Sequence, residues 1–277
     1  PGRVLARELA QAGRGLLVVE PRSGRVAFSH ALTRDIVEDS VGPLAKRQTH
    51  LALAEALVEI HPDQHSRIAT HFDRAQDRRA YPHAMMAGGR SLAVGAWTHA
   101  SGQFTVAVRS AATPVELARA LVGLGRALLG SGHAVEAADA LSEAVELADR
   151  HDDAVVHARA ALNMVGRAGR GALLSDEANQ MMVLRAALDH LERSDAPTDD
   201  DRRVLDALRC DLERELAIAM LLTDLPADRE RLLRASLRRA EAFDPPEPAT
   251  LAKALLGFRY ARLGPHDLPD RLADLDR

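Results

Sequence analysis

The sequence predicts a mainly α-helical protein, with one β-hairpin near its start and a stack of helix pairs after it. Hydrophobic residues make up 47% of the 277 residues but aromatic residues only 3%, so Ala and Leu have to build the core. Both are strong helix formers, and small side chains let helices approach closely. A hairpin pattern before residue 30 and a repeated helical pattern after residue 80 complete the prediction.

Residues 1–62 are predicted to form a separate unit that begins with a short helix at Val4–Leu9. The runs Gly15–Glu20 and Arg25–Phe28 flank Pro21–Gly24, and two apolar runs around a short turn are typical of a β-hairpin. Helices combined with one small hairpin indicate a winged-helix domain.

Two helices should follow the hairpin. The first begins with Ser29 as its N-cap and ends at Gly42 and Pro43, and the second runs from about Leu44 to Ile60.

Residues 63–277 are predicted to form a tetratricopeptide-like solenoid, with the clearest repeats at 81–151. A shift of 37 residues aligns Gly88 with Gly125, Gly95 with Gly132, Ala100 with Ala137, Phe104 with Leu141 and Ala107 with Ala144. Small residues at these spacings let the two helices of a repeat cross tightly, and the large residue fills the gap to its neighbour. The pattern departs from the usual repeat at Ser91, where a large residue is common, and at Asp149, where Pro is common.

Further amphipathic helices are expected beyond residue 151, as pairs that continue the stack. Their predicted bounds are Ala154–Val165, Glu177–Leu191, Asp201–Leu222, Arg229–Phe243 and Ala249–Leu263.

The usual signatures of catalysis are missing from the sequence. There is no G-x-x-x-x-G-K-[ST] phosphate loop, and neither Ser29 nor Ser101 lies in a nucleophile-elbow pattern. His61, His65 and His71 have a spacing that could suit a metal, but no partner completes a zinc set, so solvated loop histidines are the better interpretation. Cys210 is interpreted as a structural thiol. We expect no catalytic residues and no metal in this chain, and no enzyme activity of its own.

Charge and cysteine content narrow the location and the partners. A net charge of −4 gives no general attraction to nucleic acid, and Asp35, Glu38 and Asp39 would repel DNA from the helix after the hairpin. No apolar run reaches the roughly 20 residues that span a bilayer. The single cysteine suits a reducing compartment. We therefore expect a cytoplasmic protein without direct contact to nucleic acid or membrane. Because the chain starts at Pro1, we expect it to be part of a longer protein.

Three segments resemble a known family. They are Phe28–Asp35 (FSHALTRD), Arg47–Leu57 (RQTHLALAEAL) and Ile68–Phe72 (IATHF). They are similar to the end of the ATPase module, and the transition into repeats, of signal-transducing ATPases of the STAND class, which include large ATP-binding LuxR-type transcriptional regulators of bacteria. The resemblance covers about residues 1–112.

The resemblance implies a regulatory role that depends on an upstream nucleotide-binding core. His30 matches the winged-helix histidine that contacts the phosphate of bound ADP in this class, although Ala31 stands where relatives often have Asp. ATP or ADP would then belong to the parent protein, and this chain itself would carry no cofactor. The repeats would bind a small effector or a protein. Two alternatives remain: the sensor arm of a nucleotide cyclase or protein kinase with the same module, and a plain tetratricopeptide scaffold for protein–protein interaction.

Overall fold

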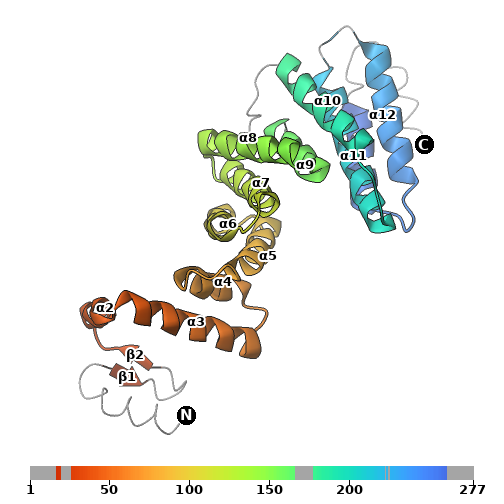
Figure 1. Ribbon diagram of the computed structural model, residues 1–277. Helices are drawn as coiled ribbons and strands as arrows, with labels where there is room; N and C mark the ends of the chain where they lie inside the picture. The colour runs from red at the N-terminus through yellow and green to blue at the C-terminus, as the bar shows by residue number, and fades with distance from the viewer. Residues whose placement is uncertain (1–16, 20–25, 166–176, 222, 224, 261–277) are drawn as a thin grey trace.

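The structure is a computed structural model that describes residues 17–19, 26–165, 177–221, 223 and 225–260. Within these ranges the protein is mainly α-helical, and the helices follow one another along an elongated stack from α3 to α12 (Figure 1). Short connections join most helices, so neighbours in the sequence are also neighbours in space. This arrangement is a helical solenoid.

Two short strands lie at the N-terminal end. β1 (Leu17–Val19) and β2 (Val26–Phe28) pair antiparallel, with Leu17 opposite Phe28. The next helix, α2 (Ala31–Ser40), has His30 as its N-cap instead of the predicted Ser29. The backbone of His30 is extended, at φ −138° and ψ 140°, so the helix starts one residue later.

The described residues around α2 do not by themselves form the core that a winged-helix domain needs. Among the described residues α2 buries no side chain, and its Leu32 and Ile36 are largely exposed. The predicted helix Val4–Leu9 and the turn Pro21–Gly24 lie outside the described residues. In contrast, Ala54 of α3 (Pro43–Ile60) is fully buried in a core shared with the helix that follows it.

Five helices form the middle of the stack: α4 (His65–Arg74), α5 (Ala80–Ala93), α6 (Trp97–Ser110), α7 (Pro114–Gly130) and α8 (Ala134–Arg150). The two copies aligned by the 37-residue shift have matching geometry. A Cβ at Gly88 would lie 2.7 Å from the Phe104 ring, and one at Gly125 would lie 2.6 Å from Leu141. Gly95 and Gly132 both have positive φ, 72° and 85°, at the turn between the two helices of each copy. The predicted register is therefore present in the structure.

Aromatic side chains close the contacts between these copies. The Phe104 ring also fills the space over Gly123 of α7, where a Cβ would lie 2.3 Å from it. Trp97 covers Gly130 at the end of the same helix, again at 2.3 Å from a Cβ placed there. Both rings thus hold α6 against α7.

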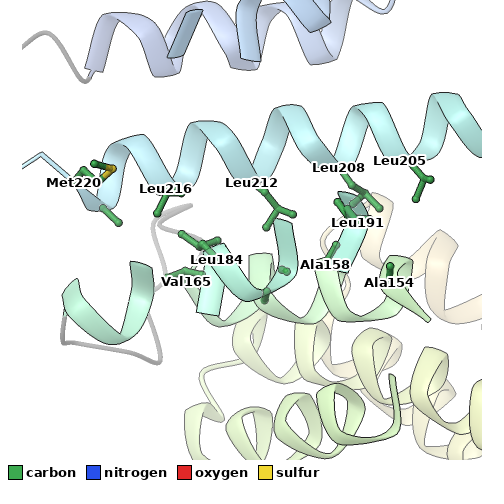
Figure 2. Packing of buried hydrophobic residues seen from close by; sticks show 13 residues of the cluster. Ala154, Ala158, Val165, Leu184, Leu191, Leu205, Leu208, Leu212, Leu216 and Met220 are labelled. Carbon is green, nitrogen blue, oxygen red and sulfur yellow. The ribbon is translucent and has the colours of Figure 1, made fainter. Parts of the chain in front are cut away.

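Five further helices complete the described part: α9 (Ala154–Val165), α10 (Glu177–Arg193), α11 (Asp199–Ala219), α12 (Pro226–Glu241) and α13 (Pro248–Tyr260). One apolar face of α11 packs on α9 and α10 (Figure 2). Leu205, Leu212 and Leu216 on this face recur at helical spacing and are buried. They pack in a cluster with Leu184 and Leu191 of α10.

The helix bounds differ from the prediction mainly at the ends. α11 begins two residues earlier than predicted, because Thr198 accepts a hydrogen bond from the backbone N–H of Asp201 and so caps the helix at Asp199. It stops at Ala219 instead of Leu222. Phe243 lies just past the end of α12 and is buried there.

Candidate functional site

A groove of about 630 Å³ runs along the inner side of the solenoid. Most of its lining residues lie on α5, α7, α9 and α11, with single residues from α6 and α13. Its lining residues are Met85, Gly89 and Leu92 of α5, Phe104 of α6, Arg119, Val122, Gly123, Arg126 and Leu129 of α7, Arg159, Leu162 and Asn163 of α9, Leu208, Asp211, Arg214 and Glu215 of α11, and Lys253 of α13.

One wall of the groove is basic. Arg119 and Arg126 lie seven residues apart on α7, and Arg159 lies beside them on α9. Arg119 forms an ion pair with Asp153 at 3.4 Å. Among the described residues, neither Arg126 nor Arg159 forms an ion pair, and the carboxylate of Asp153 acts on Arg159 only at longer range. Desolvation, and then the neighbouring charge of Arg119, lower the pKa of Arg159. An anion bound here would relieve this repulsion.

The opposite wall carries charges that neutralise one another. On α11, Arg214 forms ion pairs with both Asp211 and Glu215, and Lys253 of α13 lies 3.1 Å from Asp211. The groove lining also includes apolar side chains, among them Leu92 of α5, Val122 and Leu129 of α7 and Leu162 of α9. The groove therefore presents unpaired positive charge next to an apolar surface.

His30, the residue for which the resemblance predicts a phosphate contact, lies far from the groove, at the start of α2 near the N-terminal end of the stack (Figure 1). It is exposed, and its side chain makes no hydrogen bond with a described residue. Arg34, one turn further on, is paired with the adjacent Asp35 at 2.7 Å. Both ring nitrogens of His30 are thus available to a group outside the described residues.

The interpretation of His65 and His71 as loop histidines is wrong. Both lie on α4 and are half-buried, whereas His61 is exposed at the end of α3. His71 Nδ1 lies 3.0 Å from His50 Nδ1 on α3, and His65 Nδ1 lies 3.0 Å from His83 Nδ1 on α5. Each pair joins neighbouring helices, which local spacing in the sequence could not reveal.

Cys210 is a buried residue of α11, as suits a structural thiol. It is 1% exposed, and its Sγ lies 3.5 Å from the carbonyl oxygen of Ser236 on α12. Burial raises the pKa of the thiol to about 12, and the nearby Glu213 adds to this effect. Very little reactive thiolate is present at neutral pH.

A third histidine pair was not predicted from the sequence at all. His157 of α9 and His190 of α10 lie with Nδ1 atoms 3.1 Å apart, and Asp149 at the end of α8 meets both. These residues are spread over 41 positions, so no short motif joins them. The one signal was Asp149 itself, which stands where the repeat pattern usually has Pro.

Comparison with known proteins adds no family to these observations: no protein-family model matches the chain, and no curated protein matches it. None of the helices in the described part of the chain combines the length and the apolar character needed to cross a bilayer.

Proposed function

We propose that this chain is a regulatory arm of a STAND-type protein, in which the inner groove binds an acidic peptide segment of a partner protein. The observation that carries the proposal is the asymmetry of the groove. Among the described residues neither Arg126 nor Arg159 is within ion-pair distance of a carboxylate, and Asp153, which acts on Arg159 at longer range, is paired with Arg119. The charges of helix α11 are already paired.

A peptide suits this groove better than a compact anion does. The positive charges lie on two helices, α7 and α9, which also contribute apolar side chains such as Val122 and Leu162 to the groove. An extended segment that alternates acidic and apolar residues can contact both kinds of surface at once. The inner face of a solenoid is also the surface that such proteins commonly use for binding.

The proposal can be tested with a fluorescein-labelled decapeptide of alternating Glu and Leu, titrated with the chain and followed by fluorescence anisotropy. Replacing both Arg126 and Arg159 by Gln should weaken binding roughly tenfold, about 1.4 kcal/mol. Raising the salt concentration should weaken the wild-type complex, because exposed charges are screened.

Arg150→Gln is the matched control, because Arg150 is an exposed arginine of α8 outside the groove. It should leave the affinity unchanged, and a Lys–Leu peptide of equal length should bind poorly. Equal affinity of wild type and the double variant would reject the groove as the binding site. Binding of free glutamate as tight as that of the peptide would replace the peptide by a small anion.

The second part of the proposed function couples the groove to the nucleotide state of an upstream core through His30. By the resemblance, residues 1–62 would be a winged-helix unit that rotates when nucleotide is exchanged. His30 is exposed, and its side chain makes no hydrogen bond with a described residue, so its imidazole could donate one N–H to a phosphate oxygen of ADP in that core.

This coupling predicts that His30→Ala in the parent protein speeds the release of bound ADP. The measurement is the dissociation rate of a fluorescent ADP analogue from the purified parent protein. His61→Ala, at another exposed histidine beside a helix end, should have no effect. An unchanged rate in His30→Ala would leave a plain interaction scaffold as the better description of the chain.

A further inference from the structure

Two imidazole nitrogens and one carboxylate oxygen lie close together at the contact of α9 with α10 and the end of α8. His157 Nδ1 lies 2.8 Å from Asp149 Oδ1, His190 Nδ1 lies 3.8 Å from the same oxygen, and the two nitrogens are 3.1 Å apart. The imidazole rings are almost fully buried, at 8% and 7% side-chain exposure, whereas Asp149 is 55% exposed. The cluster therefore has a buried base of two imidazoles and an open side toward solvent.

A fourth residue fixes which nitrogen of His190 is free. Asp152 Oδ1 lies 2.8 Å from His190 Nε2, so this nitrogen carries the proton and donates it to the carboxylate. The Nδ1 atom of His190 then presents its lone pair to Asp149 and His157. Asp152 has positive φ, 55°, a conformation that few residues other than Gly, Asn and Asp adopt readily. The turn thus brings the largely exposed Asp152 carboxylate within hydrogen-bond distance of the ring.

Hydrogen bonds alone satisfy this cluster incompletely. With the proton of His190 on Nε2, facing Asp152, only the N–H of His157 Nδ1 is available to both Asp149 Oδ1 and His190 Nδ1. Asp149 Oδ1 and His190 Nδ1 therefore compete for the single hydrogen on His157 Nδ1.

We propose that Asp149, His157 and His190 bind a divalent transition-metal ion, Zn²⁺ in preference to others, and that Asp152 orients His190 as the outer partner. Zn²⁺ bonds of roughly 2.0–2.2 Å at tetrahedral angles place neighbouring ligand atoms roughly 3.4 Å apart. The observed separations of 2.8, 3.1 and 3.8 Å scatter around that value. One face of a tetrahedron is thus already formed by the side chains.

The ligand types decide which class of ion fits. Imidazole nitrogen with one carboxylate suits Zn²⁺ and similar transition metals, whereas Mg²⁺ and Ca²⁺ prefer oxygen ligands. A carboxylate that holds the outer N–H of a metal-bound histidine is the usual outer partner at such sites. When the ion binds, the proton on His157 Nδ1 would move by way of solvent to Nε2 of the same ring, so that the neutral imidazole presents its Nδ1 lone pair to the metal. Water would complete the fourth position on the exposed side of Asp149.

The other two histidine pairs provide an internal comparison. In the part of the chain that the structure describes, Asp149, His157 and His190 form the one group of three potential metal ligands whose atoms lie within 4.8 Å of one another. The pair of His50 and His71 is part of no such group. A metal at the third pair would tie the end of α8 to both α9 and α10.

The test is a Zn²⁺ titration of the EDTA-treated chain in competition with a chromogenic chelator. The wild-type chain should take up one Zn²⁺ tightly, and excess Mg²⁺ should not displace it. Asp149→Asn and His157→Gln should each weaken binding at least tenfold, and Asp152→Asn by roughly 10–100-fold. His71→Gln, in the pair without a carboxylate, should leave the affinity unchanged.

A spectroscopic readout separates loss of the site from loss of the fold. Co²⁺ in the wild-type chain should give the intense visible absorption of tetrahedral coordination, and Asp149→Asn should lose it while keeping its far-ultraviolet circular dichroism. Because Asp149 is largely exposed, this variant should fold. The proposal is overturned if Asp149→Asn and His157→Gln bind Zn²⁺ as tightly as wild type, or if His71→Gln weakens binding as much as they do.

Discussion

Phe104 shows how single residues set the spacing of the stack. Its ring is 3% exposed and lies between Gly88 of its own pair and Gly123 of the next, both too close to accept a Cβ without movement. Gly102, on the same helix as Phe104, has no atom within 4 Å of the place where a Cβ would be. Gly88 and Gly123 are therefore needed because the Phe104 ring leaves no room for a side chain, whereas no such contact excludes a side chain at Gly102.

We expect Gly123→Ala to lower the free energy of unfolding by roughly 1–3 kcal/mol, because the added methyl group meets a buried ring that is held on both sides. Gly102→Ala should raise it by roughly 0.5–1 kcal/mol, because Ala costs less backbone entropy in a helix. Urea denaturation followed by the fluorescence of Trp97, the only tryptophan, reports on this junction. Equal effects of the two substitutions would contradict the role assigned to the Phe104 ring.

For single residues, the sequence predicts those that recur at a fixed spacing, but it does not predict contacts between residues on different helices. Gly95 and Gly132 were found because their spacing recurs and because turns favour glycine. His157 and His190 come together only through the packing of α9 on α10, which no local pattern encodes. The departure at Asp149 was visible in the sequence, but its partner was not.

Helices and their order were largely predictable, since apolar periodicity and capping residues act locally. α9 has the predicted bounds, and α3 and α10 differ from theirs by one or two residues at one end. α4 was missed as a separate helix because His61 and Pro62 interrupt the pattern and its polar residues resemble a loop. Its apolar face, with Ile68 and Phe72 buried against α3 and α5, depends on neighbours that periodicity alone does not identify.

The groove was predictable only as a general property of solenoids. Its charge asymmetry depends on which arginines find acids on adjacent helices. Arg214 is paired on α11, and Arg159 on α9 is not, although both are arginines on amphipathic helices. Neither composition nor helical spacing shows which of these two arginines forms an ion pair.

Over the whole molecule, histidine pairs recur at the junctions α3–α4, α4–α5 and α9–α10. At the first two, burial is the main cause that lowers the pKa of His50, His71 and His83 below the usual value. The neighbouring charge of Arg74 lowers the pKa of His50 and His71 further, while Glu38 opposes the shift at His50. These rings are therefore neutral in the folded chain at neutral pH.

This arrangement makes the first two junctions sensitive to acid. In the unfolded chain histidines bind protons below about pH 6.5. The stability that the neutral rings contribute is therefore complete above about pH 6.5 and is lost as the pH falls toward their lower folded pKa values. From about pH 7.5 to about pH 5.5, we expect α3, α4 and α5 to lose hydrogen-exchange protection, after correction for intrinsic rates.

Two comparisons make this prediction specific. Peptides from α7, which carries no histidine, should keep their protection over the same range. His71→Gln should reduce the acid effect at α3 and α4, whereas a substitution at the exposed His133 should not. Equal protection of α3 to α5 at both pH values would show that the pairs accept protons without cost.

The contact pattern of the stack also bears on how the chain folds. Each helix packs on its neighbours or on the next helix but one, and no described helix joins the two ends of the molecule. Contacts between segments close in sequence require little loop closure, which favours rapid folding. In such a linear array folding can start at any stable pair and spread along the chain. One end of the stack can then unfold while the other stays folded. The unfolding of one helix pair is therefore expected to promote the unfolding of nearby pairs more than that of distant pairs.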